Sequence, residues 1–189
     1  MGSTPIETLM GAVNEAVQTL RTLPPGKATL VHHNDADGIA SGAILKRAFE
    51  RAGFQVENLP IERVHPLILP RIHTSDRKLI VYADLGGQAA GIIGRHLQEG
   101  TLTLILDHHP PFEVSPANLL HINPELIGID GDVSSSAATL TFLFARTMSP
   151  ENDDLAHLAM IGSLGDGQTV NGRLVGLNGM LRRSPCPKD

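Results

Sequence analysis

The chain alternates short apolar segments with segments of helical periodicity, and this alternation limits its fold more than any other feature. Apolar runs typical of strands occur at 28–33, 54–59, 78–83, 102–106 and 118–122. Patterns typical of helices occur at 4–22, 38–52, 88–98, 134–148 and 153–161. Strands that alternate with helices connect by right-handed crossovers. The sequence therefore predicts an α/β fold: a mostly parallel, doubly wound sheet of about five strands with helices on both faces.

The pattern also predicts how the chain divides. Residues 1–27 should form an N-terminal helix and a linker, because Thr4, Pro5 and Glu7 make a capping box with proline at the first helical position. Residues 28–167 should form the main domain, in which the proline-containing stretch 60–77 forms irregular structure or a short helix. Residues 168–189 are rich in glycine, then basic and broken by proline, so we expect them to begin a linker or tail.

Composition indicates a packed soluble protein. Of the 189 residues, 41% are apolar and 19% are charged, which is ordinary for a globular domain. No stretch approaches the roughly 20 apolar residues of a membrane span, and the N-terminus lacks the features of a secretory peptide. With Cys186 as the single cysteine, no internal disulfide can form. We expect a cytoplasmic protein that does not act at a membrane.

Taken alone, the charge and the aromatic content argue against a domain that binds nucleic acid by itself. The formal net charge is −5, and the chain has five Phe, one Tyr and no Trp. Domains that bind nucleic-acid backbones without sequence preference are usually basic and offer aromatic rings for stacking. However, five aspartates of the candidate site described next account for the whole of this charge, and bound divalent cations would offset it. A negative apo domain is therefore compatible with an anionic substrate.

Acidic and histidine residues follow several of the predicted elements. One group follows each of the first, third and fourth strands, and one residue follows the last helix: His33, Asp35 and Asp37; Asp84; Asp107, His108 and His109; Asp166. The carboxyl ends of parallel strands share one edge, where ligands bind. Carboxylates gathered there need cations to offset their repulsion. Oxygen and nitrogen donors suit Mn²⁺ and exclude a thiolate zinc site, and their number suits two ions about 3.5–4 Å apart, an arrangement that serves phosphoester hydrolysis.

Each motif taken singly also has an ordinary structural interpretation. The sequence Asp35-Ala36-Asp37-Gly38 is typical of a turn and a helix cap. Asp84 before Leu85-Gly86-Gly87 could cap the next helix, and Asp166 lies between glycines as in many loops. The appearance of all four sites in order at one sheet edge is what favours a functional site.

The ordered set His33-x-Asp35-x-Asp37-Gly38, Asp84, Asp107-His108-His109 and Asp166 resembles the four motifs of the DHH phosphoesterase superfamily. That superfamily includes RecJ-like single-strand nucleases, oligoribonuclease-type enzymes, exopolyphosphatases and family II pyrophosphatases. The resemblance covers residues 28–167 and implies the family's five-stranded N-terminal domain with two divalent ions, Mn²⁺ being favoured over Mg²⁺.

The resemblance also implies a role for each residue of the set. One ion would be held by His33, Asp35 and Asp84. The other would be held by Asp37, Asp84, His108 and Asp166, so that Asp84 bridges the two.

Two further residues would serve catalysis according to the same resemblance. Asp107 would orient an imidazole, and His109 would face the scissile phosphate. A water between the ions would attack phosphorus. The run Ser134–Ser136 opens a predicted helix and could bind a phosphate through backbone N–H groups and hydroxyls; the alternative is that Ser134 is simply the N-cap.

The sequence is compatible with three functions. The first is a Mn²⁺-dependent phosphodiesterase or nuclease acting on single-stranded or short oligonucleotides. The second is a phosphoanhydride hydrolase acting on pyrophosphate or polyphosphate, and the third is a catalytically silent DHH scaffold. Pyrophosphatases and oligoribonuclease-type enzymes carry a histidine where this chain has Val31, which favours the RecJ-like group. The family's C-terminal lid domain has no counterpart after Asp166, so we expect either a natural single-domain form or a fragment of a longer enzyme, and we favour the fragment because the metal edge alone would lack positioning contacts.

Overall fold

Five parallel strands form one sheet in the computed structural model, which describes residues 2–111 and 119–183. They are β1 (Lys27–His33), β2 (Gln55–Ile61), β3 (Leu79–Ala83), β4 (Leu102–Leu106) and β5 (Leu119–Ile122). The sheet order is β2-β1-β3-β4-β5, and every neighbouring pair is parallel. The predicted α/β fold is confirmed; Asn118, the first residue of the expected fifth strand, lies outside the described residues.

The strand order reverses between β1 and β3. From β1 the chain crosses to β2 on one side, then returns past β1 to β3 and continues outward through β4 to β5. Such a reversal opens a crevice at the carboxyl ends of the two central strands, where ligands bind in doubly wound folds. In this chain His33 ends β1 and Asp84 directly follows β3.

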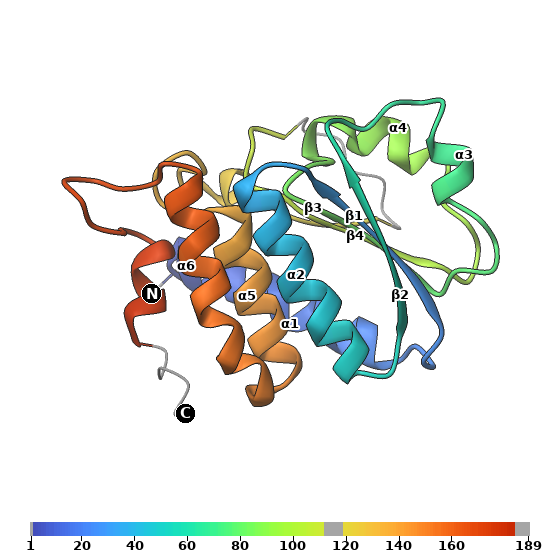
Figure 1. Cartoon of the computed structure of the whole chain (residues 1–189), viewed down its shortest axis with the longest axis horizontal. Coiled ribbons are helices and arrows are strands. Elements are labelled where there is room, and N and C mark those ends of the chain that lie inside the picture. Colours follow the sequence, from blue (N-terminus) through green and yellow to red (C-terminus); the bar gives the residue numbers. More distant parts are fainter. Residues whose placement is uncertain (1, 112–118, 184–189) are drawn as a thin grey trace.

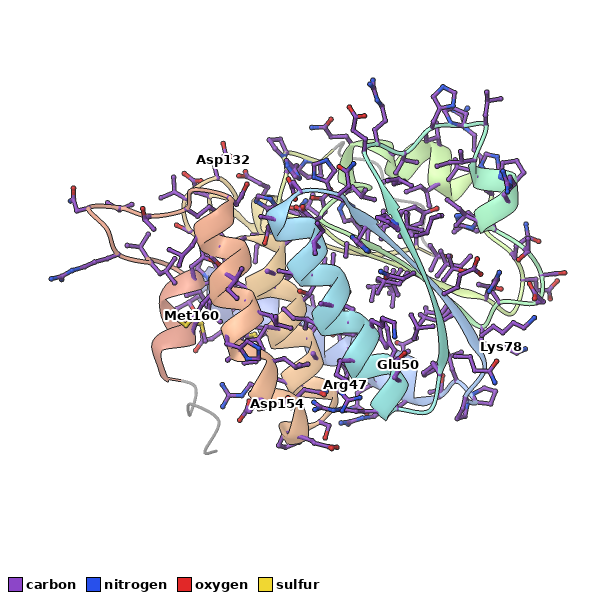
Figure 2. The ribbon with its side chains drawn as sticks, in the orientation of Figure 1. Arg47, Glu50, Lys78, Asp132, Asp154 and Met160 are labelled. Carbon is purple, nitrogen blue, oxygen red and sulfur yellow. The ribbon has the colours of Figure 1, made fainter. Side chains whose placement is uncertain are left out.

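Helices cover both faces of the sheet (Figure 1). One face is covered by α1 (Pro5–Arg21), α2 (Ala36–Arg51) and α5 (Ala137–Met148). The other face is covered by α3 (Leu69–Ile72) and α4 (Ala90–Gly94). A further helix, α6 (Ala156–Gly165), packs on α2 and α5 rather than on the sheet. Met160 and Ile161 on α6 are 39% and 57% exposed, and Figure 2 shows Met160 on the outside of this helix.

The alternation of side chains along the central strands builds two cores. In β3 all five residues are buried. Leu79, Val81 and Ala83 join the core under α1, α2 and α5, whereas Ile80 and Tyr82 join the core under α3 and α4. A strand with helices on both sides needs this continuous apolar sequence, which is why 78–83 is easily recognised.

The N-terminal helix forms as its cap predicts. Thr4 is the N-cap, its side chain accepts from the backbone N–H of Glu7, and the Glu7 carboxylate accepts from the N–H of Thr4. The apolar stripe of the helix is buried against the sheet and α5: Leu9, Val13, Ala16, Val17 and Leu20.

Three helices differ from their expected bounds. The helix expected at 88–98 is a 3-10 turn at Gly87–Ala89 followed by the short α4, which contains Gly91 and ends at Gly94. Glycine disfavours helix interiors. Helix α5 begins at Ala137, so its N-cap is Ser136 and not Ser134. Helix α6 begins after a 3-10 segment, Pro150–Leu155, and continues to Gly165.

The segment after Asp166 packs on the domain, in contrast to the expected linker. Leu174, Leu177 and Leu181 are buried in the cores around α2, α5 and α6. A 3-10 helix, Asn178–Arg183, closes the described part of the chain. The residues 184–189 lie outside it, so the division into domains stays a prediction. No helix in the described segments has the length and hydrophobicity needed to cross a membrane.

Candidate metal centre

The first cluster of the candidate site joins the ends of β1 and β3. Nδ1 of His33 lies 2.8 Å from Oδ2 of Asp35 and 3.5 Å from Oδ2 of Asp84. Asp35 is also the N-cap of α2, because its side chain accepts from the N–H of Gly38. The structural and functional interpretations of Asp35 are therefore compatible, since one carboxylate oxygen caps the helix and the other faces His33.

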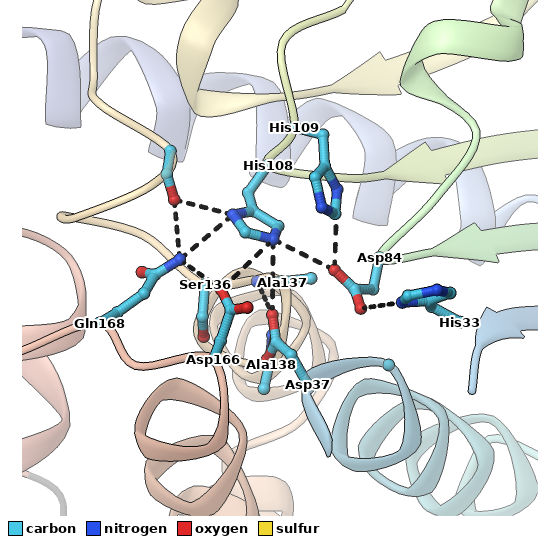
Figure 3. A network of polar contacts seen from close by, with 12 residues as sticks. His33, Asp37, Asp84, His108, His109, Ser136, Ala137, Ala138, Asp166 and Gln168 are labelled. Carbon is cyan, nitrogen blue, oxygen red and sulfur yellow. Dashed lines mark hydrogen bonds and ion pairs between the residues drawn. The ribbon is translucent and has the colours of Figure 1, made fainter. Parts of the chain in front are cut away.

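The second cluster surrounds His108 (Figure 3). Nε2 of His108 lies 3.2 Å from Oδ1 of Asp84, 3.7 Å from Oδ2 of Asp37 and 3.7 Å from Oδ2 of Asp166. Nδ1 of the same ring lies 2.7 Å from the carbonyl oxygen of Gly131, a pair in which the ring nitrogen donates. Nε2 is then left unprotonated in the neutral ring and faces three carboxylates, as in a histidine that binds a cation.

Asp84 lies between the two clusters and has an unusual backbone. Its φ is 61°, in the left-handed region that aspartate tolerates better than most residues. The side chain is 1% exposed. Neither carboxylate oxygen of Asp84, nor Nε2 of His108, makes a well-aligned hydrogen bond with any described residue. Buried polar atoms that lack hydrogen bonds indicate a missing partner. Here the atoms are carboxylate oxygens and an imidazole nitrogen, which are typical ligands of a divalent cation.

The pKa values show how strongly these groups interact. Burial raises the pKa of Asp84 to about 8, and the charges of Asp37 and Asp35 raise it as well, against the effect of His108. Burial disfavours the charged form of His108, but its contact with Asp84 dominates and raises the pKa of His108 to about 10. Burial also raises the pKa of Asp37. Buried acids whose pKa values rise in this way are stabilised as carboxylates when a nearby cation offsets their charge.

Asp37 is held by a neighbouring helix. Its two oxygens accept from the backbone N–H groups of Ala137 and Ala138, at 2.7 and 2.9 Å. These are the first residues of α5, so the positive end of that helix dipole stabilises the buried carboxylate. The same bonds fix the direction in which Asp37 faces His108.

The clustered side chains form candidate sites for metal ions. Among the described residues, three groups each have ligand atoms within 4.8 Å of one another: His33, Asp35 and Asp84; Asp37, His108 and Asp166; Asp84, His108 and His109. Carboxylate oxygens suit Mn²⁺ or Mg²⁺, and the imidazole nitrogens favour a transition ion such as Mn²⁺. Asp84 belongs to two of these groups, which is what a bridging carboxylate requires.

Asp107 lies beside the cluster, and its bonds to the protein occupy both oxygens. Oδ1 accepts from the N–H groups of His108 and His109 and from Nδ1 of His109 at 2.8 Å, and Oδ2 accepts from the N–H of Gly87. Asp107 therefore orients the His109 ring and the loop after β4. Its hydrogen bond raises the pKa of His109.

A groove of about 450 Å³ opens next to Asp84 and His109. Its lining combines site residues with an apolar wall and one arginine: His33, Glu62, Arg63, Val64, Asp84, Leu85, Gly86, Gln88, Ala89, Ile92, Asp107 and His109. Glu62 and Arg63 follow β2, so the groove extends from the site across the sheet edge toward α4.

Comparison with known proteins identifies the family. The DHH family, N-terminal domain, matches residues 27–163, which is most of the chain. The chain belongs to the DHH family. Members of this family are metal-dependent phosphoesterases.

Sequence relatives of this DHH domain are longer proteins. This chain is 30% identical over 160 residues to the uncharacterised protein MJ0831 of Methanocaldococcus jannaschii. The matched region covers 81% of this chain and 35% of that protein. The chain is 26% identical over 167 residues to the single-stranded-DNA-specific exonuclease RecJ of Thermus thermophilus, covering 84% of this chain and 25% of RecJ. The chain thus spans about a third or less of these relatives.

Solved structures share the fold of this DHH domain. An exonuclease RecJ bound to manganese superposes with a TM-score of 0.74 at 23% identity, over 90% of this chain and 46% of that one. An exopolyphosphatase-related protein from Bacteroides fragilis gives a TM-score of 0.56 at 14% identity, over 86% and 52% of the two chains.

The DHH domain brings together eight of the residues that the sequence singles out. They are His33, Asp35, Asp37, Asp84, Asp107, His108, His109 and Asp166. The serine run differs. Ser135 and Ser136 are fully buried, and Ser136 Oγ is occupied by the N–H of Thr139 and by Ser163 Oγ. Ser136 is thus a helix cap, and phosphate binding by Ser134–Ser136 stays a prediction to which these bonds give no support.

Three buried amides around the site of the DHH domain were not predicted from the sequence. Asn123 donates through its side chain to the carbonyl oxygen of His109. Gln168 donates to Asp166, and Asn178 donates to Gln168. The helical spacing of Leu174, Leu177 and Leu181 was a usable signal that 168–181 is packed.

Gly162 allows Asp37 and α5 to approach α6. A Cβ at this position would lie 2.4 Å from Cβ of Ala138 and 2.6 Å from Oδ1 of Asp37. We expect Gly162→Ala to lower the free energy of unfolding by about 1–3 kcal/mol through overpacking and to weaken Mn²⁺ binding by displacing Asp37. Denaturant unfolding and Mn²⁺ titration measure both.

Gly11→Ala is the matched control for Gly162→Ala. Nothing lies within 4 Å of a Cβ at Gly11 in α1, so alanine there should stabilise the domain by up to about 1 kcal/mol and leave Mn²⁺ binding unchanged. Equal stability of the Gly162→Ala variant and the parent would show that the contact around Asp37 is less tight than the structure indicates.

Proposed function

We propose that this DHH domain hydrolyses phosphodiester bonds of single-stranded or short oligonucleotides and depends on two divalent ions, with Mn²⁺ preferred. The observation that carries the proposal is the position of Asp84, shared between a His33–Asp35 group and a His108 group at the mouth of a groove. The name of the RecJ relatives, single-stranded-DNA-specific exonucleases, supports the substrate class.

Side chains of the two groups would hold the ions. His33, Asp35 and Asp84 would hold one, and Asp37, Asp84, His108 and Asp166 the other. When bound, two such ions supply an activated water and neutralise the oxygens of the reacting phosphate. In this site Asp84 is fixed by burial and Asp37 by the N-terminus of α5, so the donors are arranged before any ion arrives.

His109 would act on the phosphate rather than on an ion. Asp107 holds Nδ1 of the ring and raises the pKa of His109, which favours the protonated ring. Since His109 lines the groove, its second nitrogen can donate to a phosphate oxygen there. Such positioned donors stabilise the charge that develops in the transition state.

The lining of the groove favours a nucleotide over an inorganic substrate. Beside the acidic cluster it offers Val64, Leu85 and Ile92, with Arg63 as its one basic residue apart from histidines. Pyrophosphate or polyphosphate would require several cationic donors, whereas a sugar or base can pack on apolar side chains.

A substrate panel tests the proposal. Labelled single-stranded DNA, a dinucleotide and pyrophosphate would each be incubated with the chain and Mn²⁺, and again with EDTA. We expect nucleotide release from the first two, abolished by EDTA. Phosphate release from pyrophosphate alone would instead establish a phosphoanhydride hydrolase. An absence of turnover while two ions are bound would contradict the proposed activity for this chain and favour a scaffold.

A further inference from the structure

Two buried amide side chains beyond the metal cluster form a chain of hydrogen bonds that ends on it. Gln168 and Asn178 are 1% and 0% exposed, although they belong to a segment with the sequence character of a linker. Buried amides are costly unless their hydrogen bonds are satisfied. The bonds that satisfy them lead directly to Asp166.

The direction of each hydrogen bond in this series follows from which of the two atoms carries the hydrogen. The N–H of Ser136 donates to Oδ1 of Asn178 at 3.0 Å, and Nδ2 of Asn178 donates to Oε1 of Gln168 at 2.7 Å. Nε2 of Gln168 then donates to Oδ2 of Asp166 at 2.7 Å and to the carbonyl oxygen of Gly131 at 2.8 Å. Both N–H groups of Gln168 are thereby used, and neither amide can be reversed without losing bonds.

Gly131 connects this series of hydrogen bonds to His108. Its carbonyl oxygen accepts from Nδ1 of His108 as well as from Gln168, and a carbonyl has two lone pairs for this purpose. Gln168 therefore shares an acceptor with the ring of His108 while it holds the carboxylate of Asp166 (Figure 3).

Asp166 needs such support more than Asp37 and Asp84, the two other acids around His108. Its side chain is 29% exposed, against 1% for Asp37 and Asp84. It lies at the end of α6, just before Gly167, whose φ is 70°. Asp37 is fixed by two backbone N–H groups. The Asp166 carboxylate instead accepts a hydrogen bond from the side chain of Gln168.

We propose that Gln168 is a positioning residue that directs Asp166 and His108 toward the second ion, and that Asn178 holds Gln168 in the required orientation. The inference rests on the proposed function insofar as Asp166 and His108 bind a cation. Residues that orient metal ligands typically contribute 10–100-fold to metal affinity.

Mn²⁺ titration of the full chain, followed by calorimetry and electron paramagnetic resonance, tests the role of Gln168. Gln168→Met keeps the side-chain length and removes both donors. We expect the affinity for one of two ions to fall about 10–100-fold, with the other nearly unchanged. At an intermediate Mn²⁺ concentration the variant should show the six-line signal of an isolated ion, whereas the parent should show the signal of a coupled pair.

Thr169→Val is the matched control, because Thr169 is exposed next to Gln168 and its side chain takes no part in the network. It should retain two ions and the coupled signal. Asn178→Ser provides a second variant should Gln168→Met fail to fold, as judged by circular dichroism. It should weaken the same ion to a smaller degree.

The outcomes separate this proposal from the proposed function. If the parent binds two ions and both Gln168→Met and Asn178→Ser bind them with unchanged affinity and a coupled signal, the positioning role is wrong while the metal site stands. If the parent itself binds fewer than two ions, the proposed two-ion function fails, and the role of Gln168 fails with it.

Discussion

Asp84→Asn should remove both ions from this DHH domain and reduce turnover by about 10³-fold or more. Asp84 is shared by the His33–Asp35 group and a His108 group, so losing its charge weakens both sites at once. Asparagine keeps the size of the side chain and tolerates the φ of 61°. Bound metal ions stabilise the transition state by several kcal/mol, and losing that stabilisation slows turnover by about this factor. Mn²⁺ stoichiometry and single-turnover hydrolysis of labelled DNA measure it.

Two matched variants make the Asp84→Asn result specific. Asp132→Asn changes an exposed aspartate outside the cluster and should leave two ions bound. Asp107→Asn changes a buried aspartate whose oxygens are occupied by protein donors, so it should also retain both ions. Equal Mn²⁺ stoichiometry in Asp84→Asn and the parent would refute a bridging role for Asp84.

His109→Gln should leave both ions in place and slow turnover by about 10²–10⁴-fold, the range typical of a positioned proton donor. His109 pairs with Asp107 and lines the groove, and its Nδ1 lies 3.9 Å from Oδ1 of Asp84. Its contribution should therefore appear in kcat, with Mn²⁺ affinity unchanged. Kinetics at saturating Mn²⁺, together with a Mn²⁺ titration, separate the two effects.

The pH profile tests the same assignment of His109 independently. The hydrogen bond from His109 to Asp107 raises the pKa of His109, so Asp107→Asn should lower it. The protonated ring is then lost at lower pH, and the alkaline limb of the kcat profile should move toward lower pH. His157→Gln, at an exposed histidine of α6, should change neither rate nor profile. Loss of an ion in His109→Gln would instead make His109 a ligand.

The sheet and the edge that carries the site could be predicted because their signals are local. The run 78–83 is apolar on both faces of its strand, and Asp84 follows it directly, so topology places Asp84 at the ligand-binding edge. The capping box at Thr4 likewise fixed the start of α1. Elements of this kind are determined by residues that lie close together in the sequence, so their patterns can be recognised in a single sequence.

The supporting contacts could not be predicted because they join distant segments. Gln168 reaches Gly131, and Asn178 reaches Ser136; glutamine and asparagine in a glycine-rich stretch resemble linker residues until these contacts are seen. The short α4 has a different cause, since the glycines at 91 and 94 outweigh the apolar periodicity that predicted a helix over 88–98.

Anomalous diffraction from crystals soaked in Mn²⁺ tests the central claim most directly. The two-ion account predicts two strong peaks, one within bonding distance of His33, Asp35 and Asp84 and the other within bonding distance of Asp37, His108 and Asp166. A single peak, or peaks away from Asp84, in crystals saturated with Mn²⁺ would contradict it.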